Sequence, residues 1–188
     1  MLTRVMVHAP SSTANLGPGF DVFGLALDAF YDKVILSKTN KSITTNRPWH
    51  GVRILTTDNV PKDPQQNTAG LVVKAMKQKF KIKSGIEIKI KKDVPAGFGM
   101  GSSAASAAAA ALAFNKLFNL KLDNKTLIKY AGIGEKASAG TIHYDNVAAS
   151  LLGGFVVVKT KPFDVIRLEP PKDLVLCVAI PKIRVPKK

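Results

Sequence analysis

The sequence predicts an α+β fold in which a mixed or antiparallel sheet is layered with helices. Three observations predict this class: β-branched runs fill the first third, helical patterns flank one clear strand in the middle, and β-branched runs return at the end. Of the 188 residues, 46% are apolar and 22% are charged. This composition is typical of a globular domain with a sizeable core, and it excludes a disordered or fibrous chain.

The N-terminal part is predicted to form strands followed by a helix. Residues 5–8, 33–38 and 52–56 carry the signal of strands. Residues 67–80 space their apolar side chains by about 3.6 residues, which indicates a helix that begins near Asn67. Residues 86–91 alternate apolar and polar side chains, which indicates a half-buried strand.

The remaining part is predicted to hold three helices and then three strands. Residues 102–118 form a helix that is nearly all alanine, so its small side chains predict close packing on several sides. Residues 123–138 form a second helix, capped by Asp123 or Asn124, and residues 146–152 form a short third one. The predicted strands are residues 155–159, 165–168 and 174–180.

The chain carries 28 basic and 13 acidic residues, a net charge of +15. Such a charge attracts polyanions, which include nucleic acids, nucleotides and phosphorylated metabolites. Only five of the basic residues are arginine, the usual reader of base edges, and the lysines are scattered. A lysine-coated surface therefore explains the charge better than a nucleic-acid interface does.

No segment is predicted to cross or enter a membrane. The longest uncharged apolar stretch, residues 99–115, is too short and too weakly hydrophobic, and the N-terminus lacks the apolar core of a signal peptide. The single cysteine, Cys177, excludes an internal disulfide. A reducing cytoplasm is therefore the expected location.

Residues 95–106, Pro-Ala-Gly-Phe-Gly-Met-Gly-Ser-Ser-Ala-Ala-Ser, are the most informative segment. They connect a predicted strand to the alanine-rich helix, and their glycines let main-chain N–H groups converge beside a helix N-terminus. This combination predicts a phosphate site. Ser102 and Ser103 either cap the helix or offer a hydroxyl to a phosphate or Mg²⁺. The segment is neither a Walker A loop nor a dinucleotide fingerprint, and a flexible turn is the alternative.

Other polar residues have both structural and functional interpretations. Asn15 and Asp21 lie in a Gly/Pro-rich loop, where they suit turn chemistry or the recognition of a hydroxyl and an ammonium. Glu135 is either a solvated helix residue paired with a lysine or a functional carboxylate. Residues 143–146 suit a loop that holds substrate better than a metal site, because no second histidine is nearby.

Residues 95–104 fit the pattern Pro-x-x-x-Gly-x-Gly-Ser-Ser-Ala, and here the chain resembles the GHMP kinases, a family of small-molecule kinases. Two further segments are similar to the homoserine kinases of that family. Residues 9–27 resemble their N-terminal signature, and residues 143–154 contain a His-x-Asp-Asn-Val motif. The three motifs span residues 9–154, most of the chain.

The resemblance implies a fold, a reaction and a domain division. The implied fold is the GHMP kinase N-terminal domain, which is similar to domain 2 of ribosomal protein S5. The implied reaction is the ATP-dependent phosphorylation of L-homoserine to O-phospho-L-homoserine, a step of threonine biosynthesis, in a homodimer without membrane or nucleic-acid partners. Residues 1–180 are expected to form this domain, and residues 181–188 are expected to lead into a C-terminal domain absent from the chain.

The resemblance also implies residue roles. Ser103 and Glu135 are expected to hold Mg²⁺, and Asn146 is expected to orient the acceptor hydroxyl, so these three are the predicted catalytic residues. The predicted substrate-binding residues are Asn15 near the hydroxyl, Asp21 at the amino group, His143, Asp145 and Asn146. The residues predicted to bind ATP are Asn67, Pro95, Ala96, Gly97, Phe98, Gly99, Met100, Gly101, Ser102, Ser103, Ala104 and Ala105.

Two other functions stay open from the sequence. One is a GHMP kinase that acts on a different small alcohol, and the other is a basic nucleic-acid-binding module without catalysis. The glycine loop together with Glu135 argues against the second, because a nucleic-acid binder needs neither.

Overall fold

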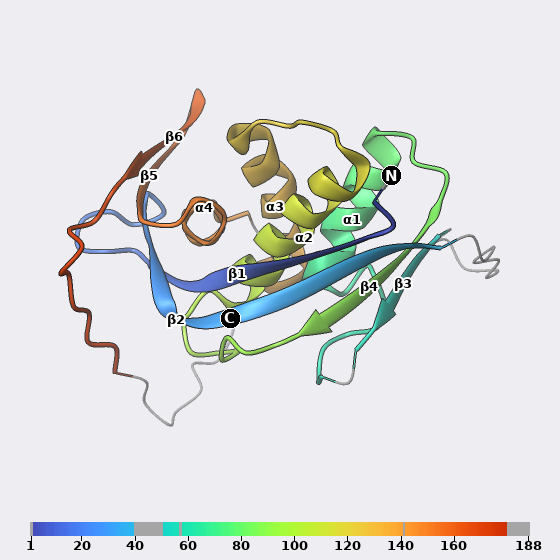
Figure 1. Cartoon of the computed structure of the whole chain (residues 1–188). Coiled ribbons are helices and arrows are strands. Elements are labelled where there is room, and N and C mark those ends of the chain that lie inside the picture. The colour runs from blue at the N-terminus through green and yellow to red at the C-terminus, as the bar shows by residue number, and fades with distance from the viewer. Residues whose placement is uncertain (1, 40–50, 57, 141, 180–188) are drawn as a thin grey trace.

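The computed structural model describes residues 2–39, 51–56, 58–140 and 142–179, and within them it has the predicted α+β architecture. The strands are β1 (Arg4–Ala14), β2 (Phe23–Thr39), β3 (Val52–Leu55), β4 (Gly85–Lys91), β5 (Phe155–Thr160) and β6 (Phe163–Leu168). The helices are α1 (Thr68–Lys79), α2 (Ser102–Phe118), α3 (Asn124–Ala139) and α4 (Asp145–Leu152). Figure 1 shows α1, α2 and α3 together on one face of the sheet, with the β5–β6 hairpin at one end.

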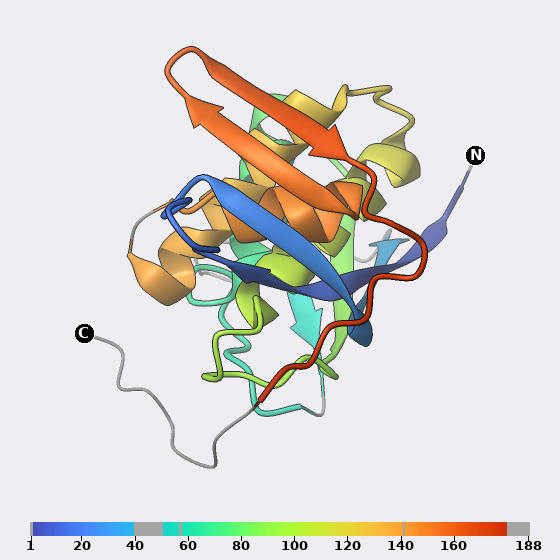
Figure 2. The same ribbon diagram turned by 90° about the vertical axis from the view of Figure 1, so that its left-hand side faces the viewer.

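The sheet is organised around β2. Its strands follow the order β3-β4-β2-β5-β6, and β1 also pairs with β2; the β3–β4 pair is parallel and the others are antiparallel. The later part of β2 pairs with β4, whereas residues 23–25 pair with β5. The register between β1 and β2 shifts between Pro10 and Ser11, an irregularity that bends a strand pair. The strand β2 therefore joins the main sheet to the β5–β6 hairpin, as Figure 2 shows.

Both β1 and β2 are longer than the sequence predicts. Residues 9–14 and 23–32 lack a sustained β-branched pattern, yet most of them pair with one another. Tertiary packing overrides local propensity here, since Ser11 and Ser12 are completely buried. The other strands from β3 to β6 and all four helices lie within two residues of their predicted bounds, and Asp123 is the N-cap of α3.

The alanine-rich helix α2 is the centre of the helical layer. Its residues from Ala104 to Ala111 are buried, and the helix contacts α1, α3, α4, β1 and β2. The predicted close packing on several sides is therefore confirmed, because only small side chains let so many neighbours approach one helix. No helix among the described residues is long and apolar enough to cross a bilayer.

The strand predicted at residues 174–180 is wrong over residues 174–179, and residue 180 lies outside the described part. Residues 174–179 form no strand, and Val175 is 89% exposed. A β-branched run becomes a strand only where a neighbouring strand edge offers main-chain partners. Figure 2 shows this segment leaving the β5–β6 hairpin and running away from it.

Candidate functional site

A cleft of about 450 Å³ lies between the β4–α2 loop, the start of α1, and the side chains of Glu135 and Asn146. Its lining includes six residues of the glycine loop, namely Pro95, Ala96, Gly97, Gly99, Met100 and Gly101, followed by Ser102 and Ser103. Asn67 and Lys92 also line it. A larger hollow of about 780 Å³ lies over β3 and β4, but none of the predicted site residues lines it. The smaller cleft is therefore the candidate site.

The φ angles along the glycine loop alternate in sign between residues 97 and 101. The φ angles of Gly97, Gly99 and Gly101 are 86°, 72° and 65°, in the left-handed region that favours glycine, whereas Phe98 and Met100 between them keep negative φ. Alternating hands turn successive N–H groups toward one side and form a concave nest for an anion. The φ angles of residues 97–101 therefore fit the backbone pattern expected of a phosphate loop.

The main-chain amides of residues 97–104 donate no hydrogen bond to the described part of the chain. The amide of Ala105 is the first one engaged, and it donates to the carbonyl of Gly101 at 2.9 Å. Gly101 is the N-cap of α2, so neither Ser102 nor Ser103 caps the helix. Amides left open at a helix start carry partial positive charge and favour an anion.

The two serines that begin α2 have different partners. Ser102 Oγ donates to the carbonyl of Val94 at 2.9 Å, which ties the ends of the loop together. Ser103 Oγ donates to Glu135 Oε2 at 3.1 Å, and Glu135 is buried rather than solvated. Neighbouring oxygens around Mg²⁺ lie about 3 Å apart, because each Mg–O distance is about 2.1 Å. The Ser103–Glu135 pair therefore fits a divalent ion that takes its other ligands from phosphates and water.

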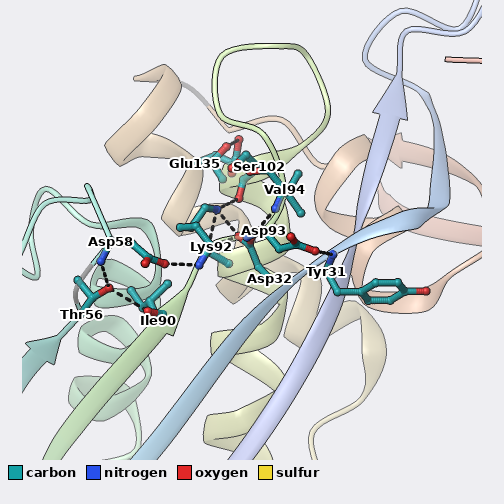
Figure 3. A network of polar contacts seen from close by, with 12 residues as sticks. Tyr31, Asp32, Thr56, Asp58, Ile90, Lys92, Asp93, Val94, Ser102 and Glu135 are labelled. Atoms are coloured by element: carbon teal, nitrogen blue, oxygen red, sulfur yellow. Dashed lines mark hydrogen bonds and ion pairs between the residues drawn. The ribbon is translucent and has the colours of Figure 1, made fainter. Parts of the chain in front are cut away.

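A buried ion pair supports the loop from below (Figure 3). Lys92, directly after β4, contacts the carboxylate of Asp32, which is completely buried in β2. Its Nζ also donates to the carbonyl of Ser102 at 2.7 Å and to Ser106 Oγ at 3.0 Å. Asp32 in turn accepts hydrogen bonds from Ser106 Oγ at 2.6 Å and from the amide of Val94 at 3.1 Å. The network joins β2, β4 and the first turn of α2.

Burial lowers the pKa of the Lys92 ammonium, and the neighbouring carboxylates of Asp32, Asp58 and Glu135 oppose that shift. The side chain of Lys92 is only 18% exposed and lines the cleft. Lys92 therefore lies beside the start of α2 as one half of a buried ion pair, and its Nζ holds the carbonyl of Ser102.

Asn67 is the N-cap of α1, as expected from its position. Its Oδ1 accepts from the amide of Gly70 at 3.1 Å, and its Nδ2 donates to the carbonyl of Pro61 at 2.9 Å. The side chain thereby joins the start of α1 to the preceding loop. Both segments line the cleft, so this amide shapes its wall.

A second polar cluster is exposed and does not line the cleft. Asn15 Oδ1 accepts from the amide of Asp21 at 2.8 Å, and His143 Nδ1 lies 2.9 Å from Asp21 Oδ1. Both Asn15 and Asp21 adopt positive φ, of 58° and 57°. Three residues that the sequence predicts for the substrate therefore meet, although 122 residues separate Asp21 from His143.

The start of α4 connects this cluster to the cleft. Asp145 is buried, and desolvation raises the pKa of its carboxyl, with Asp21 adding to the shift and His143 opposing it. Asp145 Oδ1 accepts from the amide of Asn146 at 2.7 Å. The Asn146 side chain lines the cleft and contacts Ser12 of β1. Asn146 is therefore the residue that stands between the glycine loop and the exposed cluster.

Three of the residues predicted to bind ATP, namely Met100, Ala104 and Ala105, have side chains buried in the core, and the partly buried Phe98 packs against it. Four residues of the site were missed from the sequence, namely Ser12, Asp32, Lys92 and Ser106. One signal for Lys92 was available, because residues 86, 88 and 90 point inward and the alternation puts a lysine at the next inward position.

Comparison with known proteins agrees with this geometry. Residues 67–154 match the model of the GHMP kinases N terminal domain. The chain is 44% identical over its full length to the homoserine kinase of Methanococcus maripaludis, of which it covers 60%. It is 46% identical over 88% of its length to the homoserine kinase of Thermoplasma volcanium, of which it covers 50%. The chain thus spans about half the length of the relatives that it matches.

Solved structures give the same result. The crystal structure of homoserine kinase from Cytophaga hutchinsonii superposes with a TM-score of 0.80 at 39% identity, over 91% of this chain and 53% of the other. The mevalonate kinase of Methanococcus jannaschii is only 16% identical, and with a TM-score of 0.68 it shares the fold. The α+β fold with an open amide nest at α2 is therefore that of a GHMP kinase N-terminal domain.

Proposed function

We propose that this chain is the ATP-binding part of a homoserine kinase, which transfers the γ-phosphoryl group of ATP to the side-chain hydroxyl of L-homoserine. One observation carries the proposal. The open amides of residues 97 and 99–103 belong to residues that line a cleft, together with Glu135 and Asn146. The homoserine kinases that the chain resembles at 41–47% identity support this acceptor.

The nucleotide phosphates rest on the amide nest and at the N-terminus of α2, and the Lys92–Asp32 pair holds the start of this helix in place. Ser103 and Glu135 would hold Mg²⁺, which neutralises phosphate charge in phosphoryl transfer. The family uses ATP, and the Mg²⁺ site is part of this proposal. Transfer of this kind depends on positioning and charge neutralisation more than on covalent chemistry.

The acceptor lies on the α4 side of the cleft. The exposed Asp21 carboxylate recognises the ammonium of homoserine, beside Asn15 and His143, and Asn146 orients its hydroxyl. The hydroxyl oxygen bonds to the γ-phosphorus as the bond to the bridging oxygen breaks, and ADP leaves with that electron pair. An amide cannot accept the hydroxyl proton, so the proton passes to the phosphate or to water.

The activity is tested by incubating the protein with Mg-ATP and homoserine, mevalonate or galactose, and by measuring ADP and the phosphorylated product. We expect O-phosphohomoserine, and no product from the other two alcohols. Turnover of mevalonate or galactose in place of homoserine would refute the proposed acceptor.

Nucleotide binding is tested separately by calorimetry with ADP. Glu135→Gln is expected to weaken binding of Mg-ADP at least about tenfold and to leave metal-free ADP binding unchanged, because only the ligand to the ion is lost. Glu87→Gln, in the sheet strand β4, is the matched control. An unchanged Mg²⁺ dependence in Glu135→Gln would remove this residue from the metal site.

Three further points stay predictions from the resemblance. They are a homodimeric assembly, a cytoplasmic location, and a domain that extends to residue 180. Residues 180–188 lie outside the described part of the chain.

A further inference from the structure

Ser12 joins three segments that surround the cleft. It lies in β1 just after the register shift at Pro10, and it is completely buried. Its amide donates to the carbonyl of Met100 in the glycine loop at 3.1 Å. Its hydroxyl contacts Asn146 and Ser150 of α4. A single residue of β1 therefore binds the phosphate loop through its main chain and, through its side chain, the helix that carries the predicted acceptor-binding amide.

The hydrogen bonds around Ser12 have a definite direction. Ser150 Oγ donates to Ser12 Oγ at 3.1 Å, and Ser12 Oγ donates to Asn146 Oδ1 at 3.0 Å. A hydroxyl has one proton, and the carbonyl of Asn146, at 3.3 Å, is the more distant acceptor. The side-chain oxygen of Asn146 is thereby held on the inner side of the cleft wall.

The position of Gly101 has no space for a side chain. A Cβ atom at residue 101 would lie 2.1 Å from Ser12 Oγ and 3.1 Å from Asn146 Oδ1. The hydroxyl and the amide oxygen are therefore packed directly against the Cα of a loop glycine. The loop, Ser12 and Asn146 are therefore in direct contact.

We propose that Ser12 is a positioning residue that fixes the carboxamide of Asn146, with its oxygen turned inward and its Nδ2 group facing the cleft. The inference rests on the proposed function, in which Asn146 meets the acceptor hydroxyl. It specifies that Asn146 acts as a hydrogen-bond donor to an oxygen of the acceptor or of the transferred phosphoryl group. A hydrogen bond from Nδ2 fixes the orientation of the acceptor oxygen, so that a lone pair of this oxygen points at the phosphorus. The hydroxyl proton then points away from Asn146.

The test uses Ser12→Ala, with Ser11→Ala as its matched control. Ser11 is equally buried in the same strand, but its hydroxyl donates to the carbonyl of Leu27 at 3.2 Å and has no hydrogen bond to a site residue in the described part of the chain. We expect Ser12→Ala to lower kcat about tenfold or more, with KM for ATP within about twofold of the wild type. Ser12→Cys keeps a weak donor, so its kcat is expected to lie between those of the wild type and Ser12→Ala. This variant also tests the proposal if Ser12→Ala does not fold. A kcat for Ser12→Ala within about twofold of that for Ser11→Ala would overturn the proposal.

A second measurement does not need turnover. In ¹H–¹⁵N spectra, the Asn146 Hδ2 signals are expected to shift with homoserine and Mg-ADP, and to broaden in Ser12→Ala but not in Ser11→Ala. Contacts from these protons to the Ser12 Hβ protons in the wild type would show a reversed amide and would also overturn the inference. If no alcohol is phosphorylated by the wild type, the proposed function fails, whereas these signals still decide the orientation of Asn146.

Discussion

Replacing Asp32 by Asn tests the buried ion pair beneath the glycine loop. The substitution keeps the size of the side chain but removes the charge that faces Lys92. One oxygen remains for the amides of Asp93 and Val94, which both donate to Oδ1 at 3.1 Å. The new NH₂ group faces Lys92 Nζ and Ser106 Oγ, where Oδ2 now accepts both.

The expected cost follows from the burial of both partners. Asp32 is completely buried and the Lys92 side chain is 18% exposed, so water does not replace the lost counter-ion. Breaking a buried pair on one side costs about 3–5 kcal/mol, a large part of the roughly 5–15 kcal/mol that stabilises a domain. Without Asp32 the pKa of Lys92 falls further, because burial already lowers it and the opposing charge is gone.

Urea unfolding at several pH values measures the effect. A lysine with a lowered pKa binds fewer protons in the folded state than in the unfolded state, so stability rises as the pH approaches the ordinary value of 10.5. The loss in Asp32→Asn is therefore expected to shrink with rising pH, and adding Lys92→Met is expected to recover much of it.

The exposed pair between Lys125 and Asp164 provides the control. Its atoms lie 2.7 Å apart, but both side chains are about half exposed, so Asp164→Asn is expected to change stability little. A loss for Asp32→Asn no larger than that for Asp164→Asn would refute the reasoning.

Three further predictions concern the site and its walls. Gly101→Ala is expected to abolish ADP binding in calorimetry, because the new Cβ meets Ser12 Oγ. A Cβ at residue 99 meets no atom within 4 Å, so Gly99→Ala is expected to lower the urea unfolding free energy only by the about 1–2 kcal/mol that a left-handed backbone costs alanine. Asn67→Ala is expected to lower the urea unfolding free energy by about 1 kcal/mol, since α1 loses its cap. Burial raises the pKa of Asp145, so the contribution of this carboxyl to stability falls as the pH rises above 3.8. Asp145→Asn is expected to lack this fall in urea unfolding at several pH values. The same pH dependence in the wild type and in Asp145→Asn would contradict the raised pKa.

Local patterns were enough for the helices and for the backbone of the glycine loop, whereas the other candidate site residues were predicted from the resemblance to the GHMP kinases. The alanines of α2, the alternation in β4 and the spaced glycines each specify their structure through short-range chemistry. The first strands were harder, because residues 9–14 resemble a polar loop and become a strand only through pairing with β2. Residues 174–179 show the opposite case, since their strong β signal finds no partner strand in the described part of the chain.

The site residues that the sequence did not predict are brought together by contacts between segments far apart in the chain. Asp32 and Lys92 are 60 positions apart, and nothing near either one specifies the other. Only the pairing of β2 with β4, which sets Lys33 opposite Lys91, brings them together. Ser12 was overlooked for the same reason, because its partner Asn146 is 134 positions away.

The contact between Ser12 and Asn146 has a consequence for biosynthesis. Because it spans 134 positions, its closure costs more chain entropy than a local contact does. On the ribosome, the glycine loop emerges well before α4, so a nascent chain that stops short of residue 146 has half a binding site. In the proposed function, nucleotide stabilises the finished domain by mass action, and the wall that α4 adds to the cleft is part of what the nucleotide and its acceptor meet.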